Sequence, residues 1–448
     1  MSSHDASIGR ASVTFVLVSL CVLVGGLSCP DEVAQLPVSH RTEDAGEVSV
    51  FFTGSELGAL KPCGCSGGQL GGLSKRAAIF DRSPAAGRVI VDTGTLVAGT
   101  GEQDLIKFRI LFEAFRLLAY DLVHLTDTDV QIARMLGLSA PQNGPFAVIG
   151  APWEPDRKDL RAGFVKRLVG RDGEVGVRFV SVDAQKDRPQ SAAELFARPG
   201  GEYGVNILIL RNADAESRRI WAESAGADCL VVPSDSDEPR VLSEPGERPL
   251  TFAVARFGRY VSRLRVRFPG PGTEPALFLE DIPVEETLAD DEALVNLYRQ
   301  YQELVRRSEL LEKYPRIPLP EGLEYVGSQA CQQCHSYEHA AWSQKAHADA
   351  FATLVQVGSD RDPECVICHV IGMDRESGFI SEQKTPHLKD VGCENCHGPG
   401  SEHVRSTGWT ATTEPKMSCL DCHTPEHSSG YAGNEAEYLE KIKHWREP

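Results

Sequence analysis

The chain lacks an excess of positive charge, and after its first 29 residues it lacks any apolar run long enough to cross a membrane. Its formal net charge is −18, which argues against nucleic-acid binding and allows electrostatic attraction to a basic partner. Hydrophobic residues make up 41% of the 448 positions, enough for a real core in two or three domains. These limits describe a globular protein with more than one domain.

Residues 1–29 have the features of an export signal. Arg10 precedes the apolar run Val13–Cys29, which is shorter than a comfortable membrane span. Cys29 is similar to a lipoprotein acceptor, but Gly26 stands where such motifs usually carry an aliphatic residue. Lipidation at Cys29, plain secretion and an uncleaved anchor all stay open. Each of them predicts an exported protein, either periplasmic or membrane-anchored and facing the periplasm.

Eight of the 13 cysteines fall in one repeated pattern, although an exported protein could also use cysteines as disulfides. CxxCH occurs four times, whereas this composition predicts about 0.01 occurrences by chance. The motifs are Cys331, Cys334 and His335; Cys365, Cys368 and His369; Cys393, Cys396 and His397; and Cys419, Cys422 and His423.

The spacing of this motif fits covalent attachment of haem. Two thiols three positions apart can form thioether bonds to the two vinyl groups of one haem, and the adjacent histidine then reaches the iron. Zinc sites built from CxxC pairs would not require a histidine after every second cysteine. The sequence therefore predicts four c-type haems, with their iron, in residues 321–448. That region is poor in long apolar runs, which is expected where porphyrin forms much of the core.

Further histidines in this region are candidates for the opposite side of each iron. His403 follows His397 by six residues, a reach of at most about 20 Å, and Gly398-Pro399-Gly400 spends part of that reach on a bend. We expect His403 to bind a neighbouring haem rather than the haem of His397. The histidines outside the motifs are His339, His347, His387, His403, His427 and His444.

Residues 321–448 resemble the tetrahaem cytochrome c-554 family. The resemblance rests on CQQCHSYEHAAWSQKAHADAF, on CVICHVIG leading to DVGCENCHGPG, and on a last motif followed by a helix that ends in a histidine. It implies that the haem of His369 has no sixth ligand from the protein. His387 is a departure from the family pattern, and it is a candidate ligand for that iron. The resemblance also implies three ligand pairs: His335 with His403, His397 with His347, and His423 with His444. His339 and His427 are left as bystanders.

Residues 47–285 alternate strand-like apolar runs with amphipathic stretches, which predicts a layered α/β domain. Residues 107–118 place Phe108, Leu111, Phe112, Phe115 and Leu118 on one helical face. Residues 291–314, within a linker at 286–320, predict one long helix. The predicted strands are 48–52, 88–92, 205–210, 228–232 and 250–256.

This front region resembles the 5'-nucleotidase branch of the metallophosphoesterases. The matching blocks are TGSELG (53–58), GGLSKR (71–76), VDTGT (91–95), AYDLVHLTDTD (119–129), LRNAD (210–214), VVPSDSD (231–237) and FGRYVSRLRV (257–266). Hydrolysis by two metals needs a ligand cage, and the positions that match the cage carry other residues. We therefore expect a retained fold without phosphatase activity. The replaced positions are Ser55, Leu57, Thr95, Asp127-Thr128 and Asn212.

Cys63 and Cys65, in KPCGCSGGQLGG, have no place in that resemblance. They follow the first strand, so they are expected at the carboxyl edge of the sheet, where α/β folds bind ligands. A disulfide, inert thiols in a turn, and a redox or metal-binding dithiol facing the haem region stay open as interpretations. Cys229 lies in an apolar strand and is expected to be a buried core residue.

The sequence predicts an exported multihaem cytochrome that transfers electrons between redox partner proteins, fused to an inactive phosphoesterase-like domain. One alternative is a haem enzyme that acts on a small nitrogen or oxygen compound at an open site on the iron of His369. Another is a front domain that binds a small molecule and is coupled to the haems.

Overall fold

A computed structural model describes residues 47–62, 68–138, 146–150, 163–170, 173–196, 203–268, 273–320, 322–412, 419–425, 427–428 and 430–446. The predicted export segment at 1–29, with Cys29, lies outside these residues, and so do Cys63 and Cys65. No helix in the described ranges is long and apolar enough to cross a membrane.

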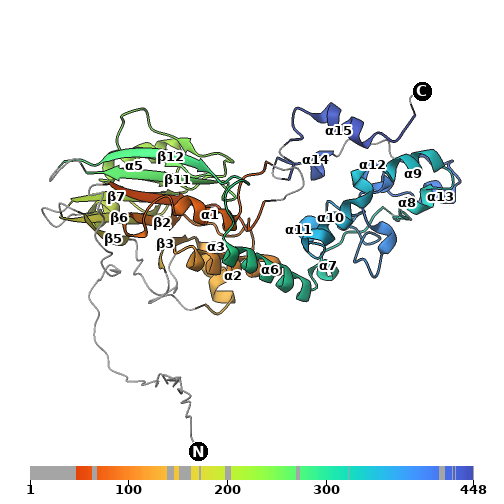
Figure 1. Cartoon of the computed structure of the whole chain (residues 1–448), viewed down its shortest axis with the longest axis horizontal. Coiled ribbons are helices and arrows are strands. Elements are labelled where there is room, and N and C mark those ends of the chain that lie inside the picture. The colour runs from red at the N-terminus through yellow and green to blue at the C-terminus, as the bar shows by residue number, and fades with distance from the viewer. Residues whose placement is uncertain are drawn as a thin grey trace, which may run out of the picture. The chain divides into compact units, whose positions relative to one another are not determined.

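The front region contains two mixed sheets of six described strands each (Figure 1). The first sheet has the order β12-β11-β1-β2-β3-β4, and the second has the order β5-β6-β7-β8-β10-β9. β1 runs parallel to β2 and antiparallel to β11. The strands are β1 (Glu47–Thr53), β2 (Arg88–Asp92), β3 (Leu122–Leu125), β4 (Ala147–Gly150), β5 (Gly163–Gly170), β6 (Gly173–Asp183), β7 (Tyr203–Arg211), β8 (Cys229–Val232), β9 (Arg240–Val241), β10 (Leu250–Ala253), β11 (Tyr260–Arg267) and β12 (Ala276–Pro283).

Side-chain alternation along the strands builds the core between the sheets. Val50 and Phe52 of β1 are fully buried in a cluster that also contains Phe179 of β6 and Ile207 of β7. Phe51, between them in sequence, points to the opposite face of the first sheet and joins a second cluster. Both faces of this sheet are therefore covered, which explains its nearly continuous apolar runs.

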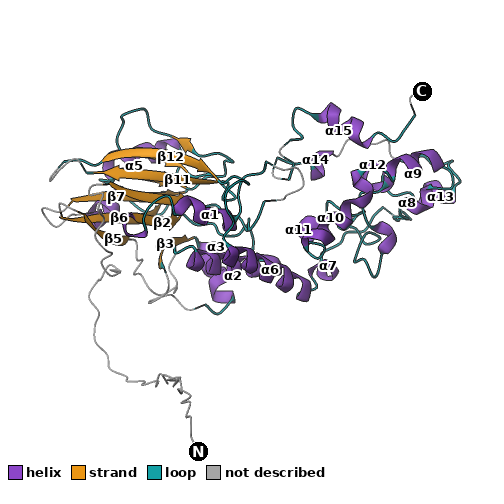
Figure 2. Ribbon diagram, in the orientation of Figure 1, coloured by secondary structure: helices purple, strands orange, loops and turns teal. Residues whose placement is uncertain are grey.

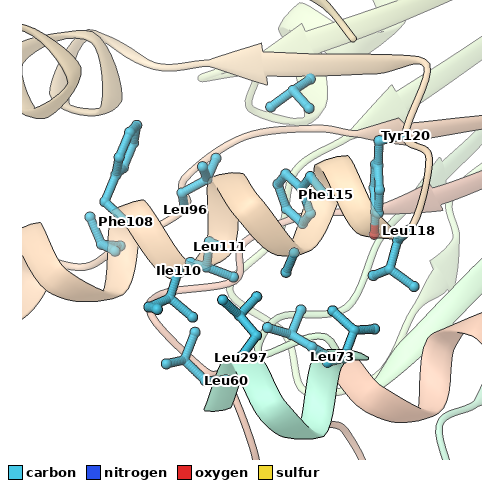
Figure 3. Packing of buried hydrophobic residues seen from close by; sticks show 14 of the residues in the cluster. Leu60, Leu73, Leu96, Phe108, Ile110, Leu111, Phe115, Leu118, Tyr120 and Leu297 are labelled. Atoms are coloured by element: carbon cyan, nitrogen blue, oxygen red, sulfur yellow. The ribbon is translucent and has the colours of Figure 1, made fainter. Parts of the chain in front are cut away.

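Helices cover the outer face of each sheet, as Figure 2 shows. Phe108, Leu111 and Phe115 of α2 are fully buried and contact the first sheet, and Leu297 of α6 packs in the same cluster (Figure 3). On the second sheet, Trp221 of α5 belongs to a separate cluster. The layered α/β fold that the sequence predicted is confirmed. The helices are α1 (Leu73–Phe80), α2 (Glu102–Leu117), α3 (Asp127–Met135), α4 (Pro189–Phe196), α5 (Ala215–Ser224), α6 (Glu292–Arg307) and α7 (Leu310–Lys313).

The prediction of one helix over residues 291–314 is wrong. α6 ends at Arg307, and a short α7 begins at Leu310. The break falls at Glu309, whose backbone is left-handed with φ 51° and ψ 37°. The amphipathic pattern continues through this point, so periodicity alone does not reveal the interruption.

The C-terminal region consists of short helices joined by loops, as expected for a chain wrapped around cofactors. One apolar cluster lies around the second CxxCH motif and includes Phe351, Val366 and Phe379. The helices are α8 (Ser328–Cys331), α9 (Ser336–Trp342), α10 (Ala350–Val357), α11 (Pro363–Val366), α12 (Cys393–His397), α13 (Ser401–Arg405), α14 (Cys419–Cys422) and α15 (Glu435–Ile442), with 3-10 turns η2 (Ala346–Asp349) and η3 (Pro386–Leu388).

Candidate cofactor sites

Each CxxCH motif lies at a short helix. Cys331 ends α8, Cys365 lies in α11, and α12 and α14 begin at Cys393 and Cys419. In α12 and α14 both cysteines of the motif are helical, and helical residues three positions apart share one side of a helix. Cys334 and Cys368 instead follow the ends of α8 and α11. All eight motif cysteines are partly or fully exposed, as attachment of a cofactor requires.

Cysteines of different motifs also meet. The thiol of Cys331 hydrogen-bonds to that of Cys393, which lowers the pKa of Cys393 to about 7. The thiol of Cys422 hydrogen-bonds to that of Cys368 and has a raised pKa, first through this bond and then through burial. The first and third motifs are therefore neighbours, and so are the second and fourth.

Six histidines face one another in pairs. The ring centres of His335 and His403 are 5.9 Å apart, those of His347 and His423 are 6.3 Å apart, and those of His397 and His444 are 6.4 Å apart. Two imidazoles on opposite sides of one metal ion have ring centres about 6 Å apart, because each metal–nitrogen bond is about 2 Å long. The residues present thus fit the c-type haems that the motifs indicate.

The pairs agree only in part with those that the family resemblance implied. His335 lies beside His403, as the family resemblance implied. His397, however, faces His444 rather than His347, and His423 faces His347 rather than His444. The tertiary fold brings the segment after α15 to the third motif and the η2 turn to the fourth. The order of histidines along the chain does not determine this arrangement.

Hydrogen bonds fix the orientation of several rings. Nδ1 of His369 lies 2.6 Å from the carbonyl oxygen of Ala350, and Nδ1 of His403 lies 2.8 Å from that of Thr410. Nδ1 of His444 is 3.0 Å from the carbonyl oxygen of Ile442. A carbonyl only accepts, so each Nδ1 donates and Nε2 keeps its lone pair. Metal-binding histidines are oriented in this way.

Burial favours the neutral form of several of these imidazoles, the form that binds metal. It lowers the pKa of His347, His397 and His423 below the ordinary histidine value. For His347 and His397, neighbouring histidines lower the pKa further. Less free energy is therefore needed to deprotonate these rings before they bind iron.

His369 is not paired with another histidine ring among the described residues. His387, its candidate partner, is exposed and packs against Gly327, where its carbonyl oxygen would lie only 2.4 Å from an added Cβ. The ligation of the His369 iron by His387 stays a prediction without a supporting contact. His339 packs on Trp342, and His427 bonds to Thr424, so both have local partners.

The segment before the second motif also contacts helices of the front region. The carboxylate of Asp362 accepts hydrogen bonds from Tyr301 in α6 and from Gln103 in α2, both at 2.8 Å. Nζ of the buried Lys107 in α2 binds both carboxylate oxygens of Glu364, at 2.5 and 2.6 Å. Glu364 directly precedes Cys365. Sequence analysis did not single out these residues, because no local pattern links them.

The positions that match the phosphoesterase metal ligands keep an unusual backbone. Ser55, Leu57, Thr95 and Asn212 all have positive φ, between 49° and 61°. L-residues adopt this conformation at a steric cost, and such residues cluster at functional sites and in turns. The described residues hold no group of three or more His, Cys, Asp or Glu side chains placed to bind a metal.

Ion pairs between side chains lie at these loops. Arg76 and Glu56, both fully buried, form a salt bridge of 2.5 Å, and Arg76 also donates to Tyr120. Nζ of Lys186 lies 3.1 Å from Asp127 and 3.7 Å from Asp183. Asp127 occupies one of the replaced ligand positions, so a Lys–Asp ion pair lies at that position.

Cys229 is fully buried in β8, as the sequence predicted. Burial raises the pKa of its thiol, and a protonated, enclosed thiol is inert. Cys63 and Cys65, for which a redox or metal-binding dithiol was one interpretation, lie outside the described residues.

Repeated CxxCH motifs with paired histidines define a multihaem c-type cytochrome. Residues 330–398 match the family described as "Cytochrome c554 and c-prime". Cytochrome c-554 of Nitrosomonas europaea is 34% identical over an alignment of 91 residues, and the match covers 17% of this chain and 39% of that protein. The resemblance of the C-terminal region is confirmed, and the chain spans about two-fifths of that relative.

Solved structures similar to this chain include a nucleotidase and a phosphoesterase. A 5'-nucleotidase precursor from Thermus thermophilus is 17% identical, with a TM-score of 0.45, over 70% of this chain and 68% of that one. The calcineurin-like phosphoesterase YfkN from Bacillus subtilis is 12% identical, with a TM-score of 0.43, over 58% of this chain and 98% of that one.

Proposed function

We propose that this protein is an exported electron carrier with four covalently bound c-type haems. The observation that carries the proposal is the set of three histidine pairs, at 5.9, 6.3 and 6.4 Å, beside the CxxCH motifs. Haem supplies one-electron redox chemistry when bound. The chain's cysteines would hold each haem, and its paired histidines would occupy both axial positions on three irons.

The histidine pairs favour electron transfer over substrate chemistry at those three sites. A pair of imidazoles leaves no open position on the iron. Nδ1 hydrogen bonds to the carbonyls of Thr410 and Ile442 hold the rings of His403 and His444 in place. Rings that are fixed in this way keep the same ligands in both oxidation states.

A second candidate function is favoured by His369, which faces no other histidine among the described residues. An iron held by His369 alone would have an open position. Such a site could bind a small nitrogen or oxygen compound, and this protein would then be a haem enzyme as well as a carrier. The two functions differ in the coordination of one iron.

Spectroscopy of the mature protein tests both proposals. The protein should be produced in a host that exports it and attaches haem. The mass should exceed that of the polypeptide by four haems, and the ferric protein should show three low-spin haems and one high-spin haem. Carbon monoxide should bind about one haem per ferrous chain. A colourless product would overturn the carrier proposal, and an entirely low-spin protein that binds no carbon monoxide would overturn the enzyme proposal.

The acidic chain, with its net charge of −18, suits a redox partner with a basic contact surface. We propose a location in the periplasm, either free or held at the membrane by the N-terminus. The front region would serve as a scaffold. Phosphatase assays with added manganese should show no turnover, and hydrolysis under those conditions would contradict this role.

A further inference from the structure

Glu394 is a buried carboxylate inside the third CxxCH motif, between Cys393 and Cys396. The residue is only 4% exposed to solvent. Within the described residues no Lys or Arg forms an ion pair with it. A buried carboxylate without partners is costly, so the groups that replace water around Glu394 indicate its role.

Backbone N–H groups from two other segments replace that water. Val326 donates to both carboxylate oxygens, at 3.0 and 3.1 Å, and Gly327 donates to Oε2 at 2.7 Å. Gly400 donates to Oε1 at 2.7 Å. Hydrogen bonds to an ionised acceptor are about twice as strong as neutral ones. Glu394 therefore fastens both segments to the third motif.

Both segments lead directly into elements of the first site. Gly327 precedes α8, which ends at Cys331 and is followed by His335. Gly400 precedes α13, which carries His403. The rings of His335 and His403 are the pair that is 5.9 Å apart. One carboxylate of the third motif thus holds the start of α8, which leads to His335, and the start of α13, which carries His403.

Neighbouring contacts leave little freedom in this arrangement. Oγ of Ser328 accepts from the N–H of Cys393 at 3.2 Å, and Oγ of Ser401 accepts from the N–H of Glu324 at 3.0 Å. Gly327 has φ 81°, a conformation that favours glycine. The N–H groups are consequently held in position to bind the carboxylate.

We propose that Glu394 is a positioning residue for the first haem site, where it sets the separation of His335 and His403. The proposal rests on the proposed haem ligation by these two histidines. Without the carboxylate, α13 is released from α8, and His403 leaves the iron. The first and third sites are thereby coupled through one side chain.

The test uses Glu394→Gln in mature full-length protein. The amide has nearly the same shape, but one acceptor oxygen becomes an N–H donor that faces a backbone N–H. We expect the high-spin signal of the ferric protein, and the carbon monoxide bound by the ferrous protein, to rise by about one haem per chain. Added imidazole should restore the low-spin signal, because it fills the position left by His403. The matched control is Glu402→Gln, which removes a partly exposed carboxylate of α13 that pairs with Arg405; it should leave the spectra unchanged.

The experiment distinguishes failure of the positioning role from failure of the proposed function. If the unmodified protein has no low-spin haem, the ligation itself is wrong. If Glu394→Gln carries every haem by mass and keeps the unmodified spectra, the positioning role is overturned. If that variant does not mature, Glu394→Asp and hydrogen exchange of the unmodified protein decide. Peptides containing Gly327 and Gly400 should be protected from exchange, and unprotected amides there would overturn the proposal.

Discussion

The three histidine pairs of this protein differ in the angle between their two rings. His397 and His444 meet at 88°, whereas the other two pairs meet at 30° and 35°. In a ferric haem with two imidazole ligands, perpendicular rings leave two iron orbitals nearly equal in energy and give a low-spin signal with a large g value. Nearly parallel rings separate those orbitals and give a rhombic signal. We therefore expect one large-g signal and two rhombic signals.

Substitution of His444 tests this assignment. His444→Ala should abolish the large-g signal, produce a new high-spin signal, and leave the rhombic signals intact. His347→Ala is the matched control and should remove a rhombic signal instead. Electron paramagnetic resonance of the ferric proteins provides the measurement. Loss of a rhombic signal in His444→Ala would show that His444 pairs with another ring, as the family resemblance implied.

A second prediction at the scale of one residue concerns the effect of the Asp92 carboxyl on stability. It is fully buried, and burial, followed by the charge of Glu56, holds the pKa of its carboxyl well above the ordinary value. Because the pKa is higher in the folded protein than in the unfolded protein, Asp92 lowers stability as pH rises through its folded pKa. Asp92→Asn keeps an acceptor for the N–H of Gly94 and can donate to Oγ1 of Thr53. We expect the free energy of unfolding at pH 8 to rise by about 1 kcal/mol, and this gain to shrink at pH 5.

Urea unfolding followed by circular dichroism measures the effect of Asp92→Asn. The control is Asp81→Asn, whose exposed carboxylate pairs with Arg88. An exposed pair of this kind contributes little, so the control should change stability by less than about 0.5 kcal/mol at either pH. A loss of stability in Asp92→Asn at pH 8 would show that the carboxyl is ionised in the folded protein.

The sequence shows cofactor-attaching residues well and their partners poorly. Cys393 and His397 were evident from spacing alone, since a thioether-linked haem imposes a local pattern. The contact of His397 with His444 joins segments far apart in the chain, and a list of histidines does not reveal it. Glu394 was hidden inside a motif whose two middle positions are chemically free. Its role depends on N–H groups that every residue except proline carries.

At the scale of elements, the linker shows where a periodic pattern stops being informative. The apolar face continues along residues 291–314, and this periodicity predicted one helix through them. Glu309 interrupts it because its φ of 51° cannot continue a right-handed helix. By contrast, β2 has the bounds that the apolar run at 88–92 predicted. Runs of buried residues therefore located strands better than periodicity located helix ends.

Glu309 is a position where glycine should stabilise the protein. The side chain is exposed, and glycine adopts positive φ without a steric cost. Glu309→Gly should raise the free energy of unfolding by about 0.5–1 kcal/mol. Ser308→Gly is the control, because Ser308 is right-handed at φ −78°, and glycine there should lower stability by a similar amount. Equal effects of the two substitutions in urea unfolding would contradict the left-handed break.

At the scale of the whole molecule, the front region contacts the chain close to the second haem motif. Lys107 of α2 is buried and pairs with Glu364, the residue before Cys365. Asp362, two residues earlier, accepts from Tyr301 of α6. These bonds place a charge of the phosphoesterase-like region next to the attachment point of the haem of His369. The front region therefore forms an ion pair with the residue that directly precedes the second CxxCH motif.

This ion pair predicts shifts of opposite sign in the reduction potential of the second haem. Lys107→Met leaves the carboxylate of Glu364 without its cation, which favours the more positive ferric state and should lower the potential. Glu364→Gln leaves the ammonium of Lys107 and should raise it. The double variant removes both charges and should lie near the unmodified protein, since the two groups form a neutral pair.

A redox titration that follows the high-spin signal assigned to the haem of His369 provides the measurement. Lys313→Met serves as the control, because Lys313 pairs with Glu102 at the exposed surface, where salt and water screen the charge. Its potential should shift much less than that of Lys107→Met. Shifts of the same sign in Lys107→Met and Glu364→Gln would mean that structural loosening, rather than charge, governs this haem. If neither Lys107→Met nor Glu364→Gln shifts the reduction potential, the charges of the front region do not influence the second haem. The front region would then serve only as a scaffold.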